Sequence, residues 1–166
     1  MNATGLLIGL LIIGIAGAGL IMISIMKSRM IVTFESPHNF EETRSRFEAL
    51  IPEYKEQGWG KPMDMLDMHA KLDEKGQAPG NINRMVSYFL CNPAMARRVL
   101  EDSPRMSAIM PCSWSIYELA DGRVIIAKMN VGLMSRIFGG VVKDAMGKVE
   151  EIEQEMLEKL LSQKTD

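Results

Sequence analysis

The sequence predicts an α+β protein, a two-layer α/β sandwich in the order β-α-β-β-α-β-β-α with one N-terminal transmembrane helix. The first 26 residues contain no charged side chain. The remaining part, about 140 residues, suits a single domain with one core. Within that part, segments rich in β-branched residues alternate with segments of helical periodicity. We therefore divide the chain into an anchor with its flank, residues 1–29, and a soluble α+β domain with a C-terminal helix, residues 30–166.

The predicted anchor runs from about Leu6 to Met26 and is uniformly apolar. At 1.5 Å per residue, a helix of the 22 apolar residues from Gly5 to Met26 spans about 33 Å, against a hydrocarbon core of about 30 Å. Ala16-Gly17-Ala18 resembles a signal-peptide cleavage site, but no basic segment precedes it and the apolar run continues beyond it. We therefore expect an uncleaved single-pass helix in the cell membrane, with the lipid bilayer as one partner.

Two features of this helix bear on its orientation and neighbours. Lys27 and Arg29 follow the apolar run, which favours a domain on the cytoplasmic side. Two pairs of small residues are spaced four positions apart: Gly5 with Gly9, and Gly14 with Ala18. This spacing is typical of membrane-helix packing, although glycine is also simply common in membrane helices.

The first strand and first helix of the domain follow directly. Met30 to Phe34 is rich in β-branched and aromatic residues and predicts a strand. Asn39 with Glu42 three residues later forms a capping-box pattern, so a helix should begin at Phe40. Its apolar residues recur at helical spacing, and the glycines at 58 and 60 should end it.

The middle of the chain predicts two strands and a short helix. Met63 to Leu72 alternates apolar and polar residues, and Met85 to Leu90 is strongly apolar. The second of these strands ends at Cys91. Asn92 then suits a helix N-cap and Pro93 the first helical position, which predicts a helix to about residue 102.

The last third predicts a β-hairpin and a long helix. Ser107 to Leu119 should be a strand broken near Pro111, and Asp121-Gly122 a turn into the strand Arg123 to Met129. Val131 to Phe138 either contacts the bilayer or a partner, or packs under the final helix. That helix should run to about residue 163, with an apolar stripe of Val142, Met146, Val149, Ile152, Met156 and Leu160.

Several short motifs occur together in the domain: Phe40-Glu41-Glu42-Thr43, Cys91-Asn92-Pro93, Met110-Pro111-Cys112, Tyr117-Glu118 and Asp121-Gly122. With them, residues 30–160 resemble the domain-of-unknown-function family 302, an uncharacterised bacterial and archaeal α/β domain. The resemblance implies a compact two-layer α/β sandwich and a homodimer. It implies no established reaction.

Cys91 and Cys112 are the strongest candidate site residues. Cys91 precedes a helix N-terminus, whose positive end should lower the pKa of its thiol. The pair could form a redox couple, carry sulfur as a persulfide or bind a soft metal. The alternative is that both are small buried hydrophobic residues.

A second, weaker metal hypothesis involves Met65 and His69. On a strand these two residues would share one face, and thioether and imidazole ligands suit Cu(I). The chain contains 15 methionines, so a methionine near a histidine is also expected by chance. The candidate metal ligands are thus Cys91, Cys112, His69 and Met65, and no resident cofactor is otherwise predicted.

Charge and motif content narrow the function. The net charge is −2 and no basic stripe is present, so nucleic acid is not an expected partner. No hydrolase triad, metalloprotease motif or phosphate loop occurs, so no catalytic residue is assigned. The glutamates at 150, 151, 153 and 155 are typical of a solvated helix face.

Two functions remain. The first is a non-enzymatic, membrane-tethered accessory or binding subunit of a membrane complex, with a membrane protein or a second copy as its partner. The alternative is a thiol-based redox, sulfur-carrying or soft-metal-binding protein that uses Cys91 and Cys112.

Overall fold

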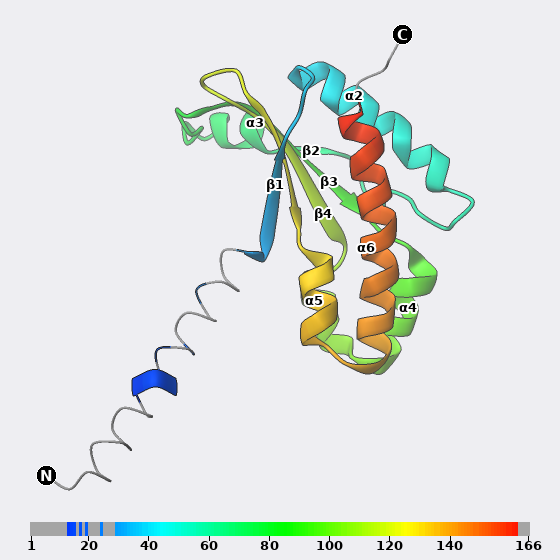
Figure 1. The fold of residues 1–166 in the computed structure, drawn as a ribbon. Coiled ribbons are helices and arrows are strands. Elements are labelled where there is room, and N and C mark those ends of the chain that lie inside the picture. Colours follow the sequence, from blue (N-terminus) through cyan, green and yellow to red (C-terminus); the bar gives the residue numbers. More distant parts are fainter. Residues whose placement is uncertain (1–12, 16, 18, 20–23, 25–28, 163–166) are drawn as a thin grey trace, which may run out of the picture. The chain divides into compact units, whose positions relative to one another are not determined.

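The computed structural model describes residues 13–15, 17, 19, 24 and 29–162. The chain divides into two compact units, Met1–Met30 and Ile31–Asp166. The second unit contains the sheet and the helices that cover it (Figure 1).

A five-stranded antiparallel sheet forms one layer, in the spatial order β1-β5-β4-β3-β2. Its strands are β1 (Ile31–Glu35), β2 (Leu66–Asp67), β3 (Ile82–Leu90), β4 (Cys112–Leu119) and β5 (Val124–Met129). The helices are α2 (Phe40–Leu50), α3 (Met68–Asp73), α4 (Pro93–Asp102), α5 (Val131–Ile137) and α6 (Gly140–Leu161), with 3-10 turns η1 (Ile51–Tyr54) and η2 (Pro104–Ile109). The structure therefore confirms a mixed α/β fold with an antiparallel sheet. The predicted element order β-α-β-β-α-β-β-α is wrong, because α3 lies between β2 and β3 and α5 precedes α6.

The core lies between the sheet and the helices α2 and α6, which cover the same face of the sheet (Figure 1). Alternate residues of the three central strands point into it and are buried; they are Val86, Tyr88, Leu90, Trp114, Ile116, Val124, Ile126 and Lys128. This alternation follows from the two-residue period of a strand. The one charged member of the set, Lys128, sits beside Trp114 in the register of β4 and β5.

Both predicted N-caps are confirmed. The side chain of Asn39 accepts a hydrogen bond from the backbone N–H of Glu42 at 3.0 Å, at the start of α2. The side chain of Asn92 accepts one from the N–H of Met95 at 3.2 Å, and Pro93 is the first residue of α4. These bonds satisfy backbone donors that have no partner within the helix.

The prediction of a strand from Met63 to Leu72 is wrong. Only Leu66 and Asp67 pair with β3, and helix α3 begins at the next residue. The carboxylate of Asp67 accepts a hydrogen bond from the N–H of Ala70 at 2.8 Å, which makes it a helix N-cap. This local cap outweighs the apolar alternation because the segment lies at the edge of the sheet, where few strand partners are available.

Further boundaries differ from the sequence predictions, and β3 begins at Ile82, three residues before the predicted start at Met85. The first helix ends at Leu50 and continues as η1, well before the glycines. Residues Pro104–Ile109 form η2, so the fourth strand begins only at Cys112. The segment after β5 forms α5, and its buried Val131 and Met134 favour packing against the domain over the alternative of a bilayer contact.

No helix in the described part of the chain combines the length and apolar character needed to cross a membrane. This finding contradicts the predicted single-pass helix at Leu6 to Met26, and with it the predicted cell-membrane localisation with a cytoplasmic domain. Of the predicted span, the structure describes only residues 13–15, 17, 19 and 24, and the rest of it lies outside the described residues. Gly5, Gly9 and Ala18 of the proposed packing motif lie outside the described residues, while Gly14 is described.

Candidate functional site: a sulfur-lined cavity

Both cysteines line one cavity beneath α4 and α6. Cys112 is the first residue of β4 and is paired with Leu90 at the end of β3. Cys91 follows β3 and exchanges two backbone hydrogen bonds of 3.0 Å with Gly60. The structure thus brings together two residues that are 21 positions apart in the sequence.

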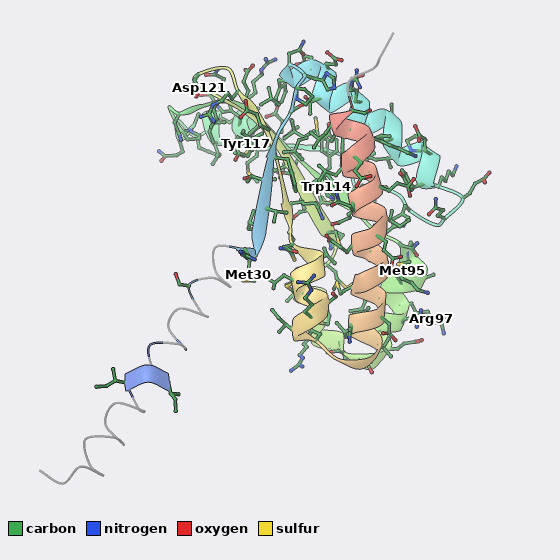
Figure 2. All side chains as sticks on the ribbon, viewed as in Figure 1. Met30, Met95, Arg97, Trp114, Tyr117 and Asp121 are labelled. Atoms are coloured by element: carbon green, nitrogen blue, oxygen red, sulfur yellow. The ribbon has the colours of Figure 1, made fainter. Side chains whose placement is uncertain are left out.

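The wall of this cavity is apolar and rich in sulfur. Besides the two cysteines, three methionines line it: Met95 of α4, Met110, and Met146 of α6. Helix α4 packs against α6, and Met95 lies beside α6 (Figure 2). The other lining residues are Trp59, Leu90, Asn92, Ala96, Val99, Pro111, Ala145 and Val149. The cavity volume is about 30 Å³. This is room for one ion or a few small atoms, and it is far below the roughly 300–1,000 Å³ of a site for an organic cofactor.

Burial keeps both thiols protonated. Both cysteines are free. Burial raises the pKa of Cys91 and is also the largest cause that raises the pKa of Cys112, to about 12. The nearby carboxylate of Glu153 adds to the effect on Cys112. The prediction that the start of α4 would lower the pKa of Cys91 is therefore wrong in direction, because burial disfavours the charged thiolate.

A buried ion pair adjoins the cavity at Cys112. The ammonium of Lys128 lies 2.7 Å from Glu153 Oε2 and 3.3 Å from Glu150 Oε2, and the side chains of Lys128 and Glu153 are only 2% and 1% exposed. The indole N–H of Trp114 donates to Glu153 Oε1 at 3.3 Å. Burial raises the pKa of Glu153, although Lys128 and Trp114 act in the opposite direction.

Sequence reasoning missed this ion pair, and the solvated-face interpretation is wrong for Glu153. The inward position of Glu153 could nevertheless have been predicted from the spacing of the apolar residues around it. One stripe of buried residues along α6 recurs at alternating steps of four and three, and its members are Val142, Met146, Val149, Glu153, Met156 and Leu160. Glu153, and not the half-buried Ile152, occupies the inward position. In the same way Lys128 continues the inward alternation of Val124 and Ile126.

His69 and Met65 lie apart from the cysteines. Both line a separate surface groove of about 270 Å³, together with Glu41, Arg44 and Arg84. His69 is on helix α3, so the argument that placed it on a strand face with Met65 is wrong, even though the two residues share the groove. Among the residues that the structure describes, no group of three or more His, Cys, Asp or Glu side chains could hold a metal ion.

Asn92 ties the cavity wall to the preceding loop. Its side-chain amide donates to the backbone carbonyl of Gln57 at 2.8 Å, while its oxygen caps α4. Gly58 has a positive φ of 85°, and a Cβ there would lie 3.1 Å from the Asn92 amide nitrogen. The asparagine, the loop and the helix start therefore form one fixed unit around Cys91.

We expect Asn92→Ala to lower the free energy of unfolding by about 1–2 kcal/mol, because the helix cap and a buried hydrogen bond are both lost. Urea denaturation followed by circular dichroism measures this change. Asn92→Ser retains a side-chain oxygen that can cap the helix and loses the donor to Gln57, so it should cost less than the alanine variant. Equal costs for the two variants would contradict a contribution from the cap.

Comparisons with known proteins place this domain in a family. The model of the family described as "Domain of unknown function DUF302" matches residues 32–163. The crystal structure of an uncharacterized conserved DUF302 protein from Bacillus stearothermophilus is similar, with a TM-score of 0.64 and 22% identity over 79% of this chain and 98% of that chain. At this identity the similarity shows the fold. None of the curated proteins matches the sequence. The family match covers most of the chain, and the chain therefore belongs to the DUF302 family.

Proposed function

We propose that this protein binds a single soft monovalent metal ion, of the Cu(I) type, in the sulfur-lined cavity. The observation that carries the proposal is the convergence of two thiols and three thioethers on one small apolar cavity. Cys91 and Cys112 would be the anionic ligands. Met95, Met110 and Met146 would supply neutral sulfur ligands or shield the ion from water.

The donor set favours soft ions over hard ones. Thiolates and thioethers select Cu(I) and related ions, whereas Mg²⁺ and Ca²⁺ require oxygen ligands. The lining offers no carboxylate, and its size suits one ion. Because the free thiols are protonated, binding of the ion releases protons, and affinity should fall as the pH falls.

The other functions predicted from the sequence differ in what they require of the cysteines. Thiol redox chemistry and sulfur transfer need a reactive thiolate, which the raised pKa of Cys91 and Cys112 disfavours. A purely accessory or binding role requires neither thiol. Replacement of the cysteines therefore separates the accessory role from the two cysteine-dependent functions, and the species bound by the wild type, a metal ion or an extra sulfur atom, separates those two.

The test is an anaerobic titration of reduced protein with Cu(I), in competition with a chromophoric chelator and followed by native mass spectrometry. We expect one bound ion in the wild type. Cys91→Ser and Cys112→Ser should each weaken binding by more than about a hundredfold, since loss of even an outer supporting group costs about 10–100-fold.

A matched control uses the other candidate ligands. The double variant His69→Ala with Met65→Leu should bind Cu(I) as the wild type does, because its groove is separate from the cavity. Wild-type affinity in both serine variants, with the fold confirmed by circular dichroism, would refute the proposal and favour the accessory role. A sulfur-sized mass increase on purified protein that a reducing agent removes would favour persulfide transport instead.

A further inference from the structure

The face of the sheet that points away from α2 and α6 is largely apolar. Successive strand residues point to opposite faces, so Trp114 is buried towards α6 whereas Tyr117 lies on the other side of the sheet (Figure 2). We call this other side the open face. Its large apolar residues, all half-buried or exposed, are Ile31 of β1, Ile125 and Met129 of β5, Tyr117 of β4 and Phe89 of β3.

The open face differs in composition from a sheet face that meets only water. In an antiparallel sheet with one solvated face, alternation normally places polar residues on the outside. The chain is 24% charged, but among the outward residues of β1, β3, β4 and β5, all of them described, only Glu35 is charged, at a corner of the face. Depletion of charge together with Tyr, Phe and Met is typical of the buried centre of a protein–protein interface.

The open face carries both a hollow and a projecting side chain. Ser87, Ser115 and Ala127 lie next to one another on three neighbouring strands. These small residues line a hollow of about 240 Å³. Ile31, on the edge strand β1, lines the same hollow and is 57% exposed. One patch of the surface therefore supplies a large apolar side chain and, beside it, a recess of small residues.

This arrangement is complementary to itself, which favours a second copy of the chain as the partner. In a two-fold symmetric interface the same patch of both subunits meets, so a projection and a recess must occur on one surface. Two sheets that pack face to face lie about 10 Å apart. At that separation the Ile31 side chain of each copy can enter the hollow of the other copy. Because the centre of the face is uncharged, no like charges meet across the symmetry axis.

The area of the open face sets the strength of such a contact. From the spacing of strands and of alternate residues along them, β1, β5, β4 and β3 present roughly 400 Å² of flat area per copy. With the projecting side chains counted, two such faces bury about 1,000 Å², which is the lower limit for a specific interface. This size fits a reversible homodimer with a dissociation constant in the micromolar range and not an obligate one.

We propose that two copies of this chain associate reversibly through their open faces, with Ile31 of each copy in the hollow formed by Ser87, Ser115 and Ala127 of the other. The sulfur-lined cavity lies beneath α4 and α6, on the helix-covered side of the sheet. Dimerisation therefore leaves the cavity of each copy uncovered. The proposal does not depend on metal binding.

The experiment is sedimentation velocity of the full-length protein in a mild non-ionic detergent, at protein concentrations across the micromolar range. We expect a monomer–dimer equilibrium in which the dimer fraction rises with protein concentration. Ala127→Lys places a charge in the hollow, and the symmetry places a second charge opposite it, so the dissociation constant should rise by about a hundredfold or more. In the monomer this lysine extends from the open face into water, so the fold should tolerate it.

A second variant and a matched control sharpen the result. Ile31→Ser removes the projection at a side chain that is already 57% exposed, and it should raise the dissociation constant by about tenfold. Ala49→Lys is the same substitution as Ala127→Lys, at an exposed position of α2 away from the open face. It should dimerise as the wild type does. Circular dichroism during urea unfolding establishes that each variant is folded.

The outcomes are distinct from those of the Cu(I) titration. A wild type that stays monomeric across this concentration range overturns the dimer. Equal association of the wild type, Ala127→Lys and Ile31→Ser also overturns it and assigns the contact to another part of the chain, the apolar residues 5–26 included. Loss of the dimer in Ala127→Lys and Ile31→Ser, with Ala49→Lys unchanged, supports the open face as the interface, whether or not the protein binds Cu(I).

Discussion

Replacement of Lys128 with methionine should lower the free energy of unfolding by about 3–5 kcal/mol, the usual cost of removing one partner of a buried ion pair. Lys128 and Glu153 are almost completely buried and lie 2.7 Å apart. Methionine has a similar length and keeps most of the packing, so the main change is an unpaired carboxylate inside the core. Equilibrium urea unfolding of the wild type and the variant measures the difference.

Two controls identify the unpaired charge as the cause. The double variant Lys128→Met with Glu153→Leu should recover much of the loss, because apolar pairs often replace buried ion pairs at little cost. The deficit of Lys128→Met should also shrink as the pH falls. Burial raises the pKa of Glu153, so the folded state binds the proton more tightly than the unfolded state, and protonation below that raised pKa restores stability. A deficit below about 1 kcal/mol would contradict the assignment.

Replacement of Trp114 with alanine should be comparably damaging, at about 3–5 kcal/mol. Trp114 is completely buried between the sheet and α6 (Figure 2), with its ring centroid 5.2 Å from that of Phe47. Its indole N–H donates to Glu153, and the Lys128 ammonium lies 5.5 Å from the ring centroid. The alanine variant therefore leaves a large void and also removes a hydrogen bond from the buried carboxylate.

Trp114→Phe separates the two contributions. It retains an aromatic ring beside Phe47 and loses the N–H, so its cost should be clearly smaller than that of the alanine variant. The same urea experiment measures both. If the phenylalanine and alanine variants were equally destabilised, the packing of the ring would not be the main contribution.

The buried ion pair also connects elements that carry part of the cavity wall. The ion pairs of Lys128 with Glu150 and Glu153 connect β5 to α6. The carboxylate of Glu150 also accepts a hydrogen bond from the backbone N–H of Gly132 at 3.1 Å, which connects α6 to α5. Met146 and Cys112 line the cavity from α6 and β4. The ion pair therefore fixes the elements on which part of the sulfur lining depends.

The sequence by itself determined the features that depend on neighbouring residues. The caps at Asn39 and Asn92 are local hydrogen bonds, and strands β1, β3 and β5 follow from β-branched composition and alternation. Helix α6 follows from its apolar period. Family membership follows from short motifs, and the same motifs contain both cysteines.

Only the tertiary structure decided the features that depend on residues distant in the chain. It showed that Cys91, Cys112 and three methionines surround one cavity, and that His69 and Met65 lie elsewhere. It reversed the expected direction of the pKa of Cys91, because burial depends on helices that pack from other parts of the sequence. The inward positions of Lys128 and Glu153 were readable from the period of each element, but their pairing was not, because sequence periodicity shows which face a residue occupies and not which residue it meets across the core.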